Sequence, residues 1–458
     1  MDSFKKRKKS FLYKYRPGQI MVLGFAGVIL AGTLILMLPI SSNSGEVTNF
    51  FDCLFTATSS VCVTGLVVLD TSLHWSVFGK AVIILLIQIG GMGFMSIGAL
   101  ISFIFGTKIN IRKRMLLQES LNQNQLSGVV RLIRRVLIFT VSIEFVGALL
   151  LSIVFIPRFG LIDGIGYSIF HSISAFCNAG FDLMGRHSGE FSSMLMFYNN
   201  SIVVLTLSAL VILGGIGFPV LICIKYNKLK FKKYDLSSKL AIITTIILLM
   251  IGTLVIFCGE YSNVSSIGTM SIVDKLKVAF FQSMTARTAG FATIDFNSFR
   301  ANTLFVLIVL MFIGASPAST GGGIKTTTLA VIFISVISFL KNENDINVFK
   351  RKVDVLTFRK ALGVFFIAIA IFVVGTYVLT ITQNEKFGLM QSAFEVSSSL
   401  ATVGLSMAGS SNLNLFGKVF ISLLMFLGRV GSLTVFTYFM NDTVQNKIRY
   451  PEEKILIG

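Results

Sequence analysis

The chain has 458 residues, of which 54% are hydrophobic and 13% are charged. Soluble domains carry roughly 25% charged residues, so the composition excludes a protein whose whole surface faces water. The formal net charge is +19, and the basic residues stand in short groups that flank apolar stretches. Because these groups are not interleaved with aromatic residues, nucleic-acid binding is not expected.

The basic groups alternate with polar segments that hold few basic residues, which is the pattern of the positive-inside rule. Both termini and the basic loops are therefore predicted to face the cytoplasm. Eight stretches are apolar and reach the length of about 20 residues that a helix needs to cross a bilayer. These predicted spans cover residues 18–40, 77–105, 133–156, 195–224, 238–258, 301–336, 361–382 and 415–440.

Four further segments are apolar but too short to cross, and they are rich in Ser, Thr and Gly. They cover residues 50–66, 165–182, 276–292 and 389–406. Each falls between two predicted spans on the predicted outer side. A re-entrant loop fits this length, since irregular backbone at membrane depth is tolerated where protein or a water-filled cavity surrounds it.

The four short segments repeat one another. They read FTATSSVCVTGL from Phe55, FHSISAFCNAGF from Phe170, FFQSMTARTAGF from Phe280 and FEVSSSLATVGL from Phe394. Each begins with Phe and places a Gly ten positions later. The spans that follow also match, with IGGMG at 89–93, LGGIG at 213–217, IGASP at 313–317 and LGRVG at 427–431. Glycines in these spans also fit simple helix packing.

This pattern predicts an all-α membrane protein with four tandem helix–pore-loop–helix repeats around one pseudo-four-fold pore. The fold would hold eight transmembrane helices and four re-entrant loops. The predicted division is a basic cytoplasmic N-terminus (1–17), repeats at 18–105, 133–224, 238–340 and 361–440, and a cytoplasmic C-terminal tail (441–458).

One glycine per loop at one depth suits a ring of backbone carbonyls, which is how proteins replace the water of a potassium ion. The outward-curving backbone often needs positive φ, which Gly adopts at little cost. The predicted selectivity filter, which would bind potassium through its carbonyls, comprises Val63, Thr64, Gly65, Asn178, Ala179, Gly180, Thr288, Ala289, Gly290, Thr402, Val403 and Gly404.

Several charged residues near the loops have two interpretations. Asp70 and Asp295, each five positions after its Gly, are either part of a negative outer vestibule or solvated loop residues. Glu395 is either a satisfied buried acid or an ion-attracting group. Arg287 is expected to brace the third loop from behind. The five cysteines form no CxxC pair and the three histidines are scattered, so neither a zinc site nor a catalytic site is predicted.

The third repeat departs from the pattern at residues 314–328, which read GASPASTGGGIKTTT. Pro and three consecutive Gly residues break a helix, and small flexible chain below a filter can obstruct a pore. A phosphate-binding loop is excluded, because Ile324 rather than Gly precedes Lys325 and a membrane helix replaces the required strand. The sequence therefore predicts a gate at this break.

The fourth repeat departs at Arg429, where the other copies hold Gly91, Gly215 and Ala315. A charge inside a span is costly and suggests a function. Arg429 would repel potassium or pair with carbonyls of the gate; alternatively it is a buried Arg satisfied by helix C-terminal carbonyls. The predicted gate residues are Gly314, Ser316, Pro317, Ser319, Thr320, Gly321, Gly322, Gly323, Lys325 and Arg429.

Four ordered motifs, CVTGL at 62–66, NAGF at 178–181, RTAGF at 287–291 and ATVGL at 401–405, resemble the filter loops of the Trk/Ktr/HKT superfamily of potassium transporters. The resemblance covers essentially the whole chain and is strongest to the membrane subunit of bacterial Ktr systems. Some sodium-selective plant relatives have Ser at the first filter Gly; Gly65 here favours potassium.

The resemblance implies a multi-pass protein of the bacterial cell membrane that takes up potassium and is a symporter with, or is activated by, sodium. It also implies a homodimer in the lipid bilayer and a cytoplasmic KtrA-type regulatory ring that binds ATP or ADP, with no cofactor bound by this chain. A sodium-permeable cation transporter remains an alternative, as does an alternating-access carrier, although carriers often have two inverted repeats. No motif of a membrane enzyme is present, so enzymatic activity is not expected.

Overall fold

The computed structural model describes residues 17–93, 114–115, 117–118, 128–228, 230–383, 387–431, 451 and 453. Within these ranges the chain is almost entirely helical, and a two-stranded hairpin of β1 (Asn347–Val348) and β2 (Arg351–Lys352) is the exception. The helices are α1 (Pro17–Leu36), α2 (Phe50–Cys62), α3 (Val77–Met92), α6 (Val129–Phe159), α7 (Leu161–Phe176), α8 (Gly185–Ser188), α9 (Ser201–Gly215), α10 (Phe218–Asn227), α11 (Leu236–Glu260), α12 (Ile272–Thr285), α13 (Ala301–Phe312), α14 (Thr326–Leu340), α15 (Val355–Thr382), α16 (Leu389–Leu400) and α17 (Leu415–Val430). Short 3₁₀ turns cover Pro39–Ser41 (η2), Leu195–Phe197 (η3), Phe231–Lys233 (η4), Phe296–Ser298 (η5) and Ser410–Asn412 (η6).

Four long helices are apolar enough and long enough to cross a membrane. They are α1, α6, α11 and α15, and the last three have 31, 25 and 28 residues. At most a third of each apolar window is buried inside the molecule. Large apolar side chains such as Ile138, Phe145 and Phe366 are exposed on these helices. A surface of this kind suits lipid rather than water, so the chain is a helical membrane protein.

Each long helix is followed by a short helix that packs against it. The pairs are α1 with α2, α6 with α7, α11 with α12 and α15 with α16. The short helices have defined starts: Asn49 accepts a hydrogen bond from the amide of Phe51, and Ser271 accepts one from Asp274. A loop and a further helix follow each pair. The order of long helix, short helix, loop and further helix thus occurs four times along the chain. The boundaries of the repeats remain a prediction.

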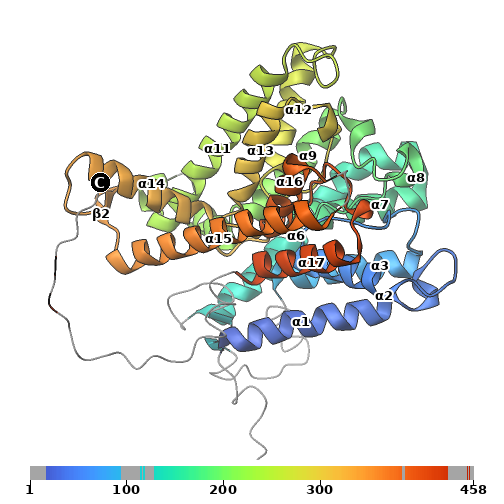
Figure 1. Cartoon of the computed structure of the whole chain (residues 1–458), viewed down its shortest axis with the longest axis horizontal. Coiled ribbons are helices and arrows are strands. Elements are labelled where there is room, and N and C mark those ends of the chain that lie inside the picture. Colours follow the sequence, from blue (N-terminus) through green and yellow to red (C-terminus); the bar gives the residue numbers. More distant parts are fainter. Residues whose placement is uncertain are drawn as a thin grey trace, which may run out of the picture.

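The helices that return from the loops, α3, α9, α13 and α17, pack on the short helix of the next group. Thus α3 contacts α7, α9 contacts α12, α13 contacts α16, and α17 contacts α2. The cycle closes because the last returning helix lies beside α2 and α1, at the opposite end of the sequence (Figure 1). The contacts between the four groups therefore form a closed cycle.

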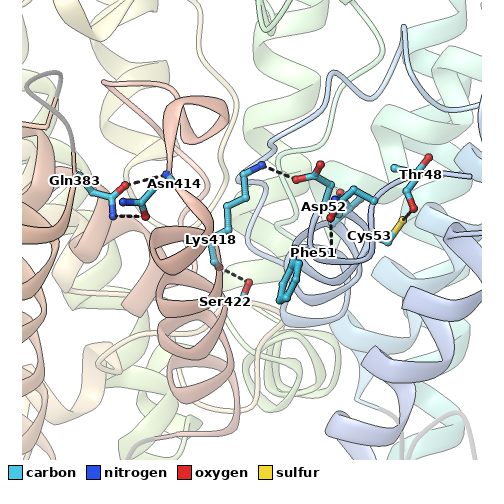
Figure 2. A network of polar contacts seen from close by, with 10 residues as sticks. Thr48, Phe51, Asp52, Cys53, Gln383, Asn414, Lys418 and Ser422 are labelled. Carbon is cyan, nitrogen blue, oxygen red and sulfur yellow. Dashed lines mark hydrogen bonds and ion pairs between the residues drawn. The ribbon is translucent and has the colours of Figure 1, made fainter.

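Polar contacts accompany this closure. Lys418 on α17 reaches Asp52 on α2, with 2.6 Å between Nζ and Oδ1 (Figure 2). Gln383 at the end of α15 donates to Asn414 Oδ1 at 2.9 Å and accepts from the Asn414 amide at 3.0 Å. The second contact fixes the start of α17 on the preceding long helix, so both neighbours of α17 are held.

Three of the four returning helices, α3, α9 and α17, end or bend at glycines with positive φ. Gly93 follows α3, Gly217 separates α9 from α10, and Gly431 follows α17; their φ angles are +79°, +101° and +93°. Such angles are rare for residues with a side chain. The helices α9 and α10 meet at 97°, so the continuous span predicted at 195–224 is instead bent. The predicted spans 77–105 and 415–440 run on into residues outside the described part.

The third returning helix has the longest interruption. Residues 313–325 separate α13 from α14, at the place where the sequence predicts a break. We call this stretch the crossing segment. Its ends lie close together, since Ile313 and Ile324 form a parallel β-bridge. The second returning helix is also interrupted, between α9 and α10. Among the described residues, however, only the third group has a long segment at the interruption.

Candidate functional site

The four predicted filter glycines lie against one another. Gly65, Gly180, Gly290 and Gly404 all have positive φ, between +70° and +98°. A Cβ built on Gly65 would overlap the carbonyl oxygen of Ala179 in the second loop. A Cβ on Gly404 would overlap the carbonyl oxygen of Thr64 in the first loop. A Cβ on Gly180 would lie 2.6 Å from Gly290 Cα, and one on Gly290 would lie 2.9 Å from the oxygen of Val403. These contacts close a circle, which we call the glycine ring.

The loops share a second conformational feature two residues before each glycine. Val63, Asn178, Thr288 and Thr402 have φ angles of 58°, 61°, 66° and 52°. The left-handed region is uncommon for residues with a side chain and is strained for β-branched ones. Four occurrences at one position show that the four loops follow the same path.

Hydrogen bonds to the short helices hold this path. The amide of Thr64 donates to Ser59 O at 2.8 Å, and the equivalent amides of Ala179 and Val403 donate to their helices at 2.7 Å. In the first and fourth loops a serine hydroxyl, Ser59 or Ser398, also accepts from the glycine amide at 3.1 Å. The loop amides are thus directed back into the protein.

The carbonyl oxygens of the twelve predicted filter residues differ from the loop amides in this respect. Among the described residues, no N–H or O–H group donates to the carbonyl of any of the twelve predicted filter residues. Of the twelve predicted filter residues, Gly404 is partly exposed and the other eleven are buried. Buried carbonyls are nearly always paired with a donor, water or an ion. A converging set of free carbonyls is a donor set that fits a desolvated monovalent cation.

The crossing segment lies against one face of these loops. Its Ser316 and Thr320 amides donate to Gly215 O at 3.0 Å and Gly214 O at 3.3 Å, on the returning helix α9. The Thr320 hydroxyl donates to Asn178 Oδ1 at 3.1 Å, in the second loop. The segment is therefore bonded both to a returning helix and to a loop.

Glycines bring the same segment against the third and fourth loops. The amide of Gly322 donates to Thr402 Oγ1 at 3.0 Å. A Cβ on Gly321 would overlap the hydroxyl of Thr288, and one on Gly322 would lie 2.5 Å from Thr402 Oγ1. A residue with a side chain could not approach so closely, which explains the run of glycines in physical terms.

Two cationic side chains bond to the crossing segment. Lys325 Nζ donates to Gly321 O at 2.7 Å. The Arg429 guanidinium donates to the carbonyl of Thr320 and to those of Gly90 and Gly91 at the end of α3, the last at 3.3 Å. Arg429 is thus bonded both to the crossing segment and to helix C-terminal carbonyls, and its role in a gate stays a prediction.

The remaining predicted gate residues lie in the same segment. Gly314 packs against the carbonyl of Gly322, and Ser319 donates to Ser316 O at 2.6 Å. The Pro317 carbonyl lies against Gly217, and Gly323 has a φ of +72°. The structure thus brings all the predicted gate residues together beside the loops.

The opposite face of the glycine ring opens into a cavity of about 350 Å³. We call it the loop cavity, because residues that follow the glycines form much of its wall. All four ring glycines line it, and so do the residues two positions after each, namely Val67, Asp182, Ala292 and Ser406. The loops therefore separate the crossing segment from the loop cavity.

The acids singled out in the sequence do not line this cavity. Asp70 is buried and accepts from the amides of Ser72, Leu73 and Phe191 at 2.9 to 3.0 Å, which makes it a tie between two connections. Asp295 is exposed and caps η5 through the amide of Asn297.

The acid that does line the cavity is Asp182, which sequence reasoning missed. Comparing the residue two positions after each glycine would have found it. It lies in the connection between α7 and α9, outside the spanning helices. Burial and the charge of Asp70 raise its pKa to about 7, although a hydrogen bond from the Met184 amide acts in the opposite direction.

Three short helices hold the chain beyond the glycine through a buried acceptor. His171 Nε2 accepts from the Leu183 amide at 3.2 Å. Glu395 accepts from the hydroxyls of Ser406 and Ser410, so it is a satisfied buried acid. These contacts fix the exits of the second and fourth loops.

The third helix uses an amide for the same purpose. Oxygen and nitrogen of a side-chain amide are assigned from their partners. In the orientation that fits, Gln282 Oε1 accepts from the amides of Thr293 at 3.0 Å and Ile294 at 3.2 Å. Arg287 is also buried behind this loop and donates to Thr245 O at 3.0 Å, as expected for a brace.

Apolar spanning helices around four loops with free carbonyls define a membrane protein suited to cations. The family model for TrkH, described as a cation transport protein, matches residues 4–449. The chain therefore belongs to the TrkH family of cation transport proteins, which confirms the resemblance recognised in its four motifs. The family consists of transporters rather than enzymes.

Individual relatives are similar over nearly their whole length. The Ktr system potassium uptake protein B of Bacillus subtilis is 42% identical over 445 residues, which cover 97% of each chain. The potassium/sodium uptake protein NtpJ of Enterococcus hirae is 41% identical over 456 residues, covering 98% of this chain and 99% of that protein. The crystal structure of the potassium transporter TrkH from Vibrio parahaemolyticus shares the fold, with a TM-score of 0.75 and 18% identity over 95% of this chain and 86% of that one.

Proposed function

We propose that this protein is the potassium-translocating membrane subunit of a Ktr-type uptake system and that ions pass through the glycine ring. The observation that carries the proposal is the set of predicted filter carbonyls for which the described residues supply no donor. Carbonyl oxygens at one constriction can replace the hydration shell of potassium. The likeness to the Ktr system potassium uptake protein B supports potassium as the substrate.

In this proposal the four groups of helices are the four repeats of one pore. Its filter is made of the backbone from Val63 to Gly65 and the three equivalent stretches. The cyclic packing of each returning helix on the next short helix supports a single central path. A path of this kind needs no alternation between two accessible states, which favours a channel-like mechanism over a carrier.

The crossing segment would be the gate. Its bonds to Asn178, Thr402 and Arg429 hold it across one face of the loops. Lys325 and Arg429 add positive charge there, which opposes the passage of a cation. A cavity of about 190 Å³ borders Gly323, Lys325 and Arg429 and offers room for the segment to move. Opening would break the bonds to the loops first.

The likeness to Ktr proteins also supports partners and a location for this chain. We infer a homodimer in the bacterial cell membrane with both termini in the cytoplasm. A KtrA-type ring that binds ATP or ADP would act on the gate from that side. Sodium would stimulate uptake, and the chain itself would bind no cofactor.

A second candidate is a transporter that also passes sodium. The name of the Enterococcus hirae relative, a potassium/sodium uptake protein at 41% identity, favours it. The same carbonyl set would serve both ions, and selectivity would then depend on the number and rigidity of the oxygens.

Growth of a bacterium that lacks its own potassium uptake systems tests the proposal. The full chain is expressed with and without a regulatory ring from a related species, and uptake of potassium and sodium is measured. We expect growth at low potassium and saturable potassium uptake, both stronger with the ring. Absence of potassium uptake in both cases, in cells whose membranes contain the protein, would contradict the proposal.

A further inference from the structure

The loop cavity has one feature that the carbonyl filter does not explain. Its wall includes the residue two positions after each ring glycine, namely Val67, Asp182, Ala292 and Ser406. Only Asp182 is ionisable among these four equivalents, and no Lys or Arg lines the cavity within the described part of the chain. When Asp182 is ionised, the cavity is therefore negative on the side of the second loop.

The Asp182 carboxylate is only partly satisfied by the protein. Its Oδ1 accepts from the Met184 amide at 2.9 Å, and no protein donor to Oδ2 is found among the described residues. Asp70, whose charge acts on it, is also an acid, and Asp70 already accepts from three amides. A carboxylate with a free oxygen and a like-charged neighbour favours a proton or a cation beside it, and at a pH above its pKa the cation remains.

The volume of the cavity sets the kind of cation. About 350 Å³ is roughly ten times the share of one water molecule in the liquid, which is about 30 Å³. An ion that keeps several of its waters fits there. At the glycine ring neighbouring loops lie so close that an added Cβ would overlap the next backbone, so an ion has to exchange those waters for carbonyl oxygens.

We propose that Asp182 and the loop cavity form a capture site for a hydrated monovalent cation, in which the ion is held before it enters the glycine ring. The inference rests on the proposed function. The carbonyls of the ring carry no net charge, so the attraction that concentrates ions at its mouth comes from Asp182.

The substitution Asp182→Asn separates charge from shape. It keeps the volume and an oxygen acceptor for the Met184 amide, and it removes the negative charge. Ala292→Asp places a carboxylate at the equivalent position of the third loop, on the wall of the same cavity. Asp295→Asn is the matched control, because Asp295 is an exposed acid near the loops that does not line the cavity.

The experiment measures initial rates of rubidium uptake at mildly alkaline pH, normalised to the protein in the membrane. Asp182→Asn should raise KM about three- to tenfold and leave the maximal rate near that of the parent, since capture and not passage is affected. The increase should be larger at low ionic strength, where screening is weak. Asp295→Asn should leave KM unchanged.

Moving the charge decides between attraction and a structural role. The double variant with Asp182→Asn and Ala292→Asp should return KM to within about twofold of the parent, because a charge anywhere on the wall acts on the same volume. An unchanged KM in Asp182→Asn overturns the inference while leaving the proposed function intact. A fall in maximal rate that the moved charge does not restore also overturns it.

A further variant covers the case in which Asp182→Asn does not reach the membrane. Ala292→Asp alone adds a second charge to the intact cavity and should lower KM, and no change in KM would contradict the capture site. A parent protein without rubidium or potassium uptake would instead refute the proposed function, and the capture site with it.

Discussion

The residues that stand two positions before the ring glycines adopt a backbone that their side chains disfavour. Three of the four, Val63, Thr288 and Thr402, are β-branched and have φ angles between 52° and 66°. Strain of this kind persists where the surroundings determine the conformation, and such residues gather at functional sites. Here the amide of the next residue donates a hydrogen bond to the short helix, and these bonds hold the backbone in this conformation.

Residues beyond the glycine are held as well, and His171 is the clearest case. It is buried, its Nδ1 bonds to Tyr167 O at 2.7 Å, and its Nε2 accepts from the Leu183 amide at 3.2 Å. A carbonyl needs a donor and an amide needs an acceptor, so the ring is neutral with its proton on Nδ1. His171 is a positioning residue for the exit of the second loop.

We predict that His171→Phe lowers the preference for potassium over sodium and not merely the amount of protein. Phe fits among the aromatic rings that surround this position, such as Phe155 and Phe170. It leaves the buried Leu183 amide without an acceptor, at a cost of about 1–3 kcal/mol. Sodium competition against rubidium uptake measures the effect.

The matched control is His187→Phe. His187 contacts Tyr167 and Phe159, as a second histidine in the same aromatic cluster, but it does not bond to the loop exit. The control should keep the parent selectivity. Equal losses in the two variants, or no loss in His171→Phe, would speak against the positioning role.

At the scale of elements, the returning helices and the short helices fit through glycine. A Cβ on Gly90, Gly214 or Gly428 would overlap the carbonyl of Val61, Phe176 or Leu400, at equivalent places in three short helices. In the third group Gly314 packs instead against Gly322 of the crossing segment. These helix glycines are therefore packing residues, and the exception marks the element that differs.

We predict that Arg429→Ala increases potassium flux by freeing the crossing segment. The change removes the bond to Thr320 O and the bonds to Gly90 and Gly91. If the lost bonds contribute ~1 kcal/mol to the closed state, the open population rises about fivefold. Flux from protein reconstituted in liposomes measures this, without a regulatory ring.

Arg429→Lys divides charge from bonding, since Lys keeps the charge but loses the planar fork of donors. Flux close to that of the parent would assign the effect to repulsion, and flux close to that of Arg429→Ala would assign it to the bonds. Parent-like flux in Arg429→Ala would remove Arg429 from the gate.

The sequence predicted some of these elements and not others, for physical reasons. The loops were predictable because four similar segments place a Gly at the same position, and such a repeat indicates a shared backbone conformation. The interruption at 313–325 was predictable because Pro317 and three glycines cannot continue a helix. The 97° bend at Gly217 was not, because glycine inside an apolar stretch also serves packing.

The site was predicted unevenly for a similar reason. Backbone positions such as Gly65 follow from the repeat, and the structure brings them together. The sequence pattern drew attention to acids five positions after Gly65 and Gly290, and Asp182 is not at that spacing. Which acid lines the cavity depends on how the connection after each loop folds. Asp70 illustrates this, since amides from two connections bind it away from the cavity.

At the scale of the whole molecule, the chain closes on itself. Each returning helix packs on the next short helix, and α17 completes the cycle on α2, where Lys418 meets Asp52 (Figure 2). The crossing segment covers one face of the central loops and the loop cavity opens on the other. The order along the proposed path is therefore capture, filter and gate.

The potassium-to-sodium permeability ratio of a Gly290→Ser variant in liposomes tests the central claim most directly. Gly290 has a φ of +79°, and a Cβ there would lie 2.8 Å from Gly180 Cα and 2.9 Å from Val403 O, so any side chain displaces the ring. Gly363→Ser on α15 is the control, because a Cβ there meets nothing within 4 Å. We predict that the ratio falls about tenfold, or ~1.4 kcal/mol, in Gly290→Ser and stays unchanged in the control. A parent-like ratio in Gly290→Ser would contradict a potassium filter at the glycine ring.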